Sequence, residues 1–461
     1  MSTYSGLCGG GSQTRLCGGG SPTRLEASKP HRHRDLVASI VGLVLRPLHA
    51  LLAAPSLLFL AVLAIMLFRP PDLSLFCIDR VLFVLLIAVV LLRSFLQHQP
   101  ILLFSSATWP MIGLLVLALG SALVQPFNAQ TWSLLASKFL VPFTLFHVAG
   151  LVFPGEREQG QFETFALLIL AYLSLTAIAS LLGMTALVFP RYILDESIGI
   201  HADRARGPFL QAVANGVTLN LLGIVGLHSY RRGRLRGPVA FMILTALPVA
   251  ILATMTRAVW LSFAGSVLLL FFFAKSPRLR RACFCLICAG TFGVLAALSA
   301  PQSRALFHDR LQERSPVEFR MTIYEVSWEM IGEKPLFGWG QNQMPPQIAR
   351  RMSDYRPETY CAHNSYLEIL VEQGFVGLAL YGWLVVCLVR LGAARAQSSE
   401  GGDSLFDQHF RRLWPVLLSV YLVNAVFVVM NYQFVNALLF TIAGILSAQN
   451  QHPLRSPDVV N

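Results

Sequence analysis

The sequence predicts an all-α integral membrane protein with about twelve transmembrane helices. Of its 461 residues, 55% are hydrophobic and only 13% are charged, a balance too apolar for a soluble chain with an ordinary surface. Apolar windows of about 20 residues, the length that crosses the hydrocarbon layer, recur from Leu51 almost to the C-terminus. Arg and Lys gather in short clusters between these windows. We therefore expect a single membrane domain.

The apolar windows form two blocks of predicted helices, separated by one long polar stretch. Nine helices are expected within residues 36–300 and three within residues 366–449. Very short turns at Thr256-Arg257 and at Asn431 leave ten or eleven crossings as alternatives. The windows are 49–68, 76–96, 107–124, 131–153, 163–188, 209–229, 238–255, 258–274, 281–300, 366–390, 412–430 and 432–449.

The basic clusters predict the orientation in the membrane. Cytoplasmic loops carry an excess of Lys and Arg, so the clusters at 231–236, 275–281 and 395–412 are expected inside the cell. Both termini then lie in the cytoplasm, as a disordered Gly- and Ser-rich tail over residues 1–35 and a short tail over 450–461. The net charge of +12 comes from these separate clusters and forms no continuous basic face, so no nucleic-acid partner is expected.

The polar stretch over residues 301–365 is expected in the periplasm. It contains ordinary soluble sequence, including a helix-like stretch from Thr322 to Ile331 and then Pro335-Leu336-Phe337-Gly338-Trp339-Gly340. A structureless loop of this length would be unusual, so we expect a folded excursion with short helices. Functional residues concentrate in such segments.

The cysteines and acidic residues favour neither disulfides nor a metal site. Cys8 and Cys17 fall in the predicted tail, whereas the Cys283, Cys285 and Cys288 cluster falls within an apolar window. On the predicted periplasmic side there is no Asp-x-Asp pair, and the nearest acidic pair, Asp195-Glu196, is expected in a solvated loop. No metal ligand and no cofactor are therefore expected.

Three features meet on the predicted periplasmic face. Arg206, with Arg204, stands before the sixth helix, where a guanidinium can fork onto phosphate oxygens or else meet lipid headgroups. Arg257 interrupts an apolar stretch, and such a charge must be paired or hydrated, which favours a functional role over snorkelling from a helix end. His363 stands at a helix start and titrates near physiological pH, so it is either a structural histidine or a general base for a hydroxyl.

Four further residues could support this site. Lys138 lies within the fourth apolar window and could add a cation to the same cavity. Arg320 could contact a substrate phosphate or fix the excursion through a salt bridge. Asn364 follows His363, and Glu368 shares a helix face with Glu372 through their i,i+4 spacing, so these residues are expected to orient the loop.

Several short elements lie in a characteristic order along residues 200–390. They are Arg206-Gly207-Pro208-Phe209, Thr256-Arg257-Ala258, Arg320, Pro335-Leu336-Phe337-Gly338-Trp339-Gly340, His363-Asn364-Ser365-Tyr366-Leu367-Glu368 and Glu372-Gln373-Gly374-Phe375-Val376-Gly377. Together they resemble the O-antigen ligase and polymerase superfamily, whereas the first five helices match it only in general character. Each element alone is weak, but their order and common sidedness make the set fairly specific.

The resemblance implies an inverting, metal-independent glycosyltransferase of the GT-C type with a periplasmic active site. Its donor would be a glycan on undecaprenyl pyrophosphate, and its acceptor the lipid A core oligosaccharide, as in lipopolysaccharide biosynthesis. By this resemblance, Arg206 and Arg257 would hold the pyrophosphate, and His363 would act at the acceptor hydroxyl. Fixed arginines can stabilise the negative charge of such a leaving group without a metal.

Other functions share part of this pattern. An O-antigen or exopolysaccharide polymerase and a protein O-oligosaccharyltransferase use the same class of donor and differ in the acceptor, which no residue here identifies. A secondary transporter is the alternative from another class. Transporters of that kind usually show matching halves with broken helices near the midplane, whereas here the ionisable residues gather at one face.

Overall fold

The computed structural model describes residues 54–69, 77–98, 100–199, 201–299, 315–352, 363–393 and 404–451. All of them belong to one compact unit, Leu51–Asn461, and they form helices and connecting loops without a strand. The predicted tail over residues 1–35 lies outside the described residues. So do most of the C-terminal tail and parts of the predicted excursion.

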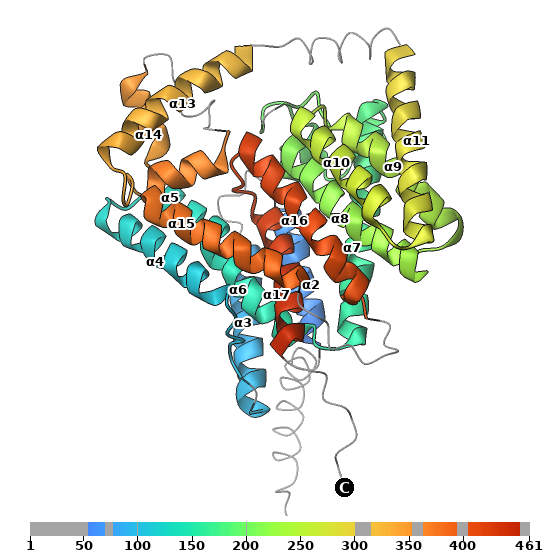
Figure 1. The fold of residues 1–461 in the computed structure, drawn as a ribbon, viewed down its shortest axis with the longest axis horizontal. Helices are drawn as coiled ribbons and strands as arrows, with labels where there is room; N and C mark the ends of the chain where they lie inside the picture. Colours follow the sequence, from blue (N-terminus) through green and yellow to red (C-terminus); the bar gives the residue numbers. More distant parts are fainter. Residues whose placement is uncertain are drawn as a thin grey trace, which may run out of the picture. The chain divides into compact units, whose positions relative to one another are not determined.

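The helices follow the order of the apolar windows (Figure 1). Their bounds are α2 Pro55–Leu67, α3 Ile78–Leu96, α4 Thr108–Val124, α5 Ala129–Leu135, the π-helical η1 Ala136–Leu140, α6 Val141–Val152, α7 Glu156–Leu181, the 3-10 turns η2 Thr185–Leu187, η3 Arg191–Leu194 and η4 Gly207–Phe209, α8 Ala212–Arg232, α9 Gly237–Ala253, α10 Arg257–Phe273, α11 Pro277–Ser299, α13 Ser315–Glu333, α14 Met344–Arg351, α15 Ser365–Ala393, α16 Gln408–Phe427 and α17 Gln433–Gln451.

The expected all-α fold is confirmed, and each apolar window falls on a helix or on the continuous run α5–η1–α6. Within the described part of the chain, six helical runs are long and apolar enough to cross a membrane, as expected of an integral membrane protein. They are Ala129–Val152, Glu156–Leu181, Ala212–Arg232, Pro277–Ala296, Ser365–Ala393 and Gln408–Phe427. Four further apolar helices, α2, α4, α9 and α10, are shorter. Twelve crossings therefore remain a prediction.

α8 is the central helix of the bundle. Almost all of its side chains are buried, because α7, α9, α10, α11 and α16 pack around it. Hydrogen bonds between polar side chains join α8 to α10 and α10 to α16: Ser266 Oγ on α10 donates to Asn220 Oδ1 on α8 at 3.2 Å, and Asn424 Nδ2 on α16 donates to Ser262 Oγ on α10 at 2.9 Å. Such bonds fix the register of apolar helices, since a buried polar group without a partner is costly.

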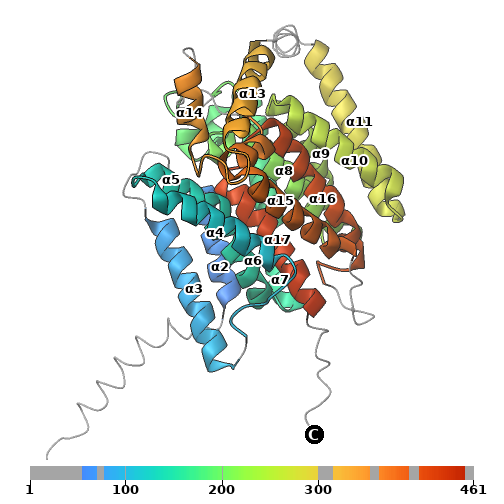
Figure 2. The ribbon, with the colours of Figure 1, turned by 60° about the vertical axis from the view of Figure 1, so that its left-hand side comes forward.

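The described helices of the predicted excursion lie at one end of the bundle, and two ion pairs join three other helices. Figures 1 and 2 show α13 and α14, the described helices of the predicted excursion, together at one end. The two arginines at the end of α8 form ion pairs with neighbouring segments. Arg231 pairs with Asp407 before α16, and Arg232 pairs with Glu163 on α7 at 2.8 Å. These ion pairs hold together the ends of α7, α8 and α16.

α15 is broken at Gly374, whose φ of 65° and ψ of −166° are not helical. In an unbroken helix the amides of Phe375 and Val376 would donate to the carbonyls of Val371 and Glu372. Here the loop 335–340 forms hydrogen bonds with all four of these groups. Trp339 N and Gly340 N donate to the two carbonyls at 2.9 and 2.8 Å, and the two amides donate to the carbonyls of Pro335 and Leu336 at 2.8 and 3.2 Å. A helix break in an apolar environment is stable only when its backbone groups find such partners.

Candidate functional site

The loop before α8 is built around a buried arginine. Arg206 is only 1% exposed, and its guanidinium donates to three backbone carbonyls: Ile193 O at 2.9 Å, Ile198 O at 2.5 Å and Asp195 O. Burial lowers the pKa of Arg206, yet an arginine stays protonated in proteins. The planar fork therefore holds the backbone at Ile193, Asp195 and Ile198 close to Arg206.

The same loop is fixed to two helices. The amide of Ala205 donates to Ala253 O at the end of α9 at 3.0 Å, and Asn215 Nδ2 on α8 donates to Ala205 O at 2.8 Å. Gly207 has a φ of +56°, and a Cβ there would lie 2.8 Å from Asn215 Oδ1. The Arg-Gly-Pro-Phe element thus needs glycine both for its backbone conformation and for its close contact with α8.

Arg257 is the first residue of α10 and is exposed. The turn before it is closed by two threonine hydroxyls, since Thr254 Oγ1 donates to Ile251 O at 2.7 Å and Thr256 Oγ1 donates to Thr254 O at 2.9 Å. Because Ala253 also accepts the amide of Ala205, the arginine begins its helix beside the Arg206 loop.

His363 lies two residues before α15, half-buried, with a left-handed φ of 49°. Asn364 is the N-cap of this helix, because its Oδ1 accepts from Tyr366 N at 3.0 Å and from Leu367 N at 3.2 Å. Ser365 Oγ then bonds Val428 O at 2.9 Å and Met430 N at 2.8 Å in the α16–α17 turn. The start of α15 is therefore held rigidly, which fixes the histidine.

Two other basic side chains act on His363. Burial first, then the positive charge of Arg320 on α13, and then His201, lower the pKa of His363 to about 4. Its imidazole is therefore neutral at physiological pH, the form that a general base requires. Arg320 is half-buried, and its Nε has no hydrogen-bond partner among the described residues.

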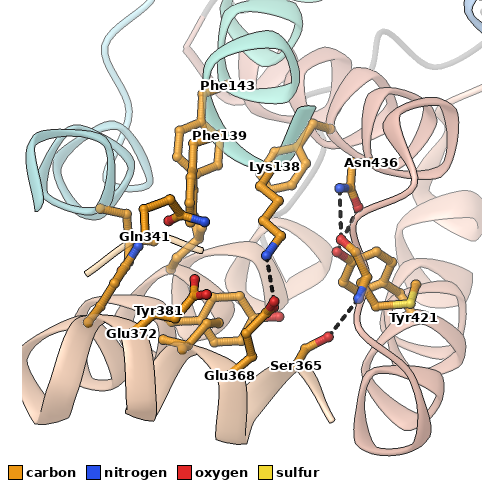
Figure 3. Close-up of a pocket in the computed structure, with 16 residues that line it drawn as sticks. Lys138, Phe139, Phe143, Gln341, Ser365, Glu368, Glu372, Tyr381, Tyr421 and Asn436 are labelled. Atoms are coloured by element: carbon orange, nitrogen blue, oxygen red, sulfur yellow. Dashed lines mark hydrogen bonds and ion pairs between the residues drawn. The ribbon is translucent and has the colours of Figure 1, made fainter. Parts of the chain in front are cut away.

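A pocket of about 60 Å³ lies along the first turns of α15, and Ser365 is one of its lining residues (Figure 3). Lys138 reaches into it from η1, and its Nζ binds Glu368 Oε1 at 2.8 Å. Glu372, one turn further along α15, is 3% exposed and also faces the pocket. The side chain of Gln341 completes the polar end.

The structure thus divides the predicted site residues into two groups. His363 and Arg320 interact, and Arg257 lies next to the loop that carries His201. Arg206 binds carbonyls, whereas Lys138 and Glu368 bind each other. Sequence reasoning missed His201, which no spacing or apolar context distinguishes, and Gln341, whose burial depends on the fold.

Arg206→Lys is expected to lower the thermal unfolding temperature, because one ammonium cannot replace a planar fork that binds three carbonyls. Hydrogen bonds to charged groups contribute about 1.5–3 kcal/mol each. Arg191→Lys is the matched control, since this exposed arginine of the same region donates to one carbonyl, Thr185 O. A stable Arg206→Lys protein with weakened donor binding would instead support a phosphate contact.

Comparison with known proteins identifies the part of the chain that carries these features. Residues 240–382 match the family described as O-Antigen ligase. The match runs from α9 into α15 and includes Arg257, Arg320 and His363, whereas Lys138 and Arg206 lie before it. No curated protein matches the chain. Residues 240–382 of the chain are thus similar to the O-antigen ligase superfamily, a family of glycosyltransferase-like membrane enzymes.

Proposed function

We propose that this protein is an O-antigen ligase of the bacterial inner membrane. It transfers a glycan from undecaprenyl pyrophosphate to the lipid A core oligosaccharide on the periplasmic face, by a GT-C-type mechanism without a metal ion. The observation that carries the proposal is a neutral, rigidly held histidine beside an arginine, within the segment that matches the O-Antigen ligase family.

In the proposed reaction His363 removes the proton from the acceptor hydroxyl, whose oxygen attacks the anomeric carbon of the donor. The bond from that carbon to the pyrophosphate breaks, and negative charge grows on the leaving group. Arg320 and Arg257 stabilise this charge, since a guanidinium can donate two parallel hydrogen bonds to phosphate oxygens. Transfer by the purified protein should therefore continue in excess EDTA.

Arg206 and Lys138 have other roles in this proposal. The guanidinium of Arg206 is committed to three carbonyls, so we assign it to holding the loop with His201 in place. Lys138 is neutralised by Glu368, so this pair offers no net positive charge to a pyrophosphate. Both residues thus stabilise the structure around the site and do not contact the pyrophosphate.

The lipopolysaccharide pattern of a strain without the protein tests the function. A ligase null strain should contain core without any attached O-antigen, and wild-type protein should restore the long chains. Arg257→Ala protein should fail to restore them. Core that carries a single repeat unit would identify a polymerase instead. An unchanged pattern would show that the protein has no role in lipopolysaccharide assembly.

A further inference from the structure

The pocket in Figure 3 contains three ionisable side chains whose charges do not cancel. Lys138 and Glu368 are 9% and 16% exposed and form an ion pair at 2.8 Å. Glu372 adds a second carboxyl that is 3% exposed. With all three groups ionised the cluster would carry one net negative charge. An uncompensated buried charge costs several kcal/mol, so some positive species must offset it.

The second observation is a set of polar atoms without protein partners. Gln341 is 1% exposed, and neither its Nε2 nor its Oε1 has a hydrogen-bond partner among the described residues. The same holds for Oε1 of Gln373, which also lines the pocket. Buried polar atoms of native proteins are satisfied by protein groups or by ordered water. The pocket has room for water, since one molecule needs about 10–15 Å³ of such space.

We infer that this pocket is an internal site for water and one exchangeable proton, which is shared among Lys138, Glu368 and Glu372. Glu368 stays ionised because the ammonium of Lys138 contacts it directly. The proton then resides on Glu372, and it makes the cluster neutral. Its O–H donates to the unpartnered oxygen of Gln341 or to a water molecule that bridges the two side chains.

The surroundings of the pocket agree with this assignment. Two tyrosines, Tyr381 on α15 and Tyr421 on α16, face it, and neither supplies a positive charge; Tyr421 donates to Asn436 Oδ1 on α17 at 2.7 Å. The backbone amides of Asn342 and Met344 also face the Glu372 carboxyl. Two neutral dipoles are weaker than the cost of a buried net charge, so the proton remains.

The charge count predicts which carboxyl groups are protonated in each variant. Glu372→Gln and Glu368→Gln each leave one carboxylate opposite one ammonium, so neither variant needs a proton. Lys138→Met leaves two carboxyls without a cation, so both should be protonated. Glu329→Gln is the control, because it removes an exposed carboxyl of α13.

Infrared spectra of the purified protein in a detergent without carbonyl groups, recorded without substrate, test the inference. The C=O stretch of a protonated carboxyl group should appear in wild type, vanish in Glu372→Gln and Glu368→Gln, and strengthen in Lys138→Met. It should persist in Glu329→Gln and shift to lower wavenumber in D2O, because water reaches the pocket. Size-exclusion profiles establish that each variant is folded.

Three results would overturn the assignment. A wild-type spectrum without the band means that all three groups are ionised. A band that survives in Glu372→Gln belongs to another acid, and a band that survives in Glu368→Gln means that the charge is not shared. If Lys138→Met does not fold, the two glutamine variants still decide the question. The measurement involves no glycan transfer, so its failure leaves the proposed function untouched.

Discussion

His363→Ala should lower the rate of glycan transfer by about 10²–10⁴-fold, the usual contribution of a general base. Donor binding should stay close to that of wild type, since the histidine acts on the acceptor. Single-turnover transfer and donor affinity, measured in matched detergent, separate the two effects. Loss of donor binding with an unchanged rate would contradict the assignment.

His98→Ala is a suitable control for this substitution. His98 is also a histidine in the left-handed backbone region, with a φ of 51°, and it is exposed after α3. Its replacement removes an imidazole and again leaves alanine in a left-handed backbone conformation. Activity should stay at the wild-type level, and equal losses in both variants would show that alanine at a left-handed position, and not the loss of the base, explains the His363 result.

The pH profile offers a further check on the same residue. Because the pKa of His363 is lowered to about 4, the base form persists across the neutral range and activity should fall only as the pH falls through that value. Arg320→Gln removes a positive charge that lowers this pKa, so the acid limb of kcat/KM should move upward. Arg320→Lys should leave the limb in place.

Gly374→Ala should destabilise the protein by at least about 2 kcal/mol, since a non-glycine residue in a strained backbone region costs about 1–3 kcal/mol. The new Cβ would also lie 2.3 Å from the carbonyl carbon and oxygen of Leu336, too close for any real contact. Movement of the loop 335–340 would break its four hydrogen bonds to α15. Thermal unfolding in detergent measures the loss.

Gly382→Ala provides the comparison within the same helix. No atom lies within 4 Å of a Cβ at this exposed position, and its φ is ordinary. Alanine is favoured over glycine in a helix by about 1 kcal/mol, so this variant should be as stable as wild type or slightly more stable. If the two variants melted at the same temperature, the contact between loop and helix break would not stabilise the protein.

The helices were predictable from the sequence, because a helix that crosses a membrane requires a long apolar run and each window is visible by itself. The contacts between distant segments were not. Arg206 binds backbone carbonyls, which every residue possesses, so its partners cannot be recognised from the sequence. A pyrophosphate clamp and a loop anchor need the same residue type. Only the fold shows which groups the guanidinium meets.

The break in α15 was hidden for a related reason. Glycines at 338, 340 and 374 belong to recognisable motifs, but the sequence does not reveal that two of these motifs bind each other. Likewise, the i,i+4 spacing of Glu368 and Glu372 predicted a shared helix face. That Lys138 lies opposite this face follows only from the fold, which brings the lysine of η1 within ion-pair distance of α15.

The ion pair between Lys138 and Glu368 also has a consequence for biosynthesis. The ribosome releases residues 129–152 long before it reaches Glu368, so the lysine enters the bilayer without its partner. A lone lysine near the middle of a helix raises the insertion free energy by about 2.5–3.5 kcal/mol, and the apolar side chains of that segment must offset it. When α15 enters the membrane, Glu368 pairs with Lys138 and removes this penalty. The packing of α15 against the helices inserted before it is therefore favourable, and the ion pair links the first half of the bundle to the last.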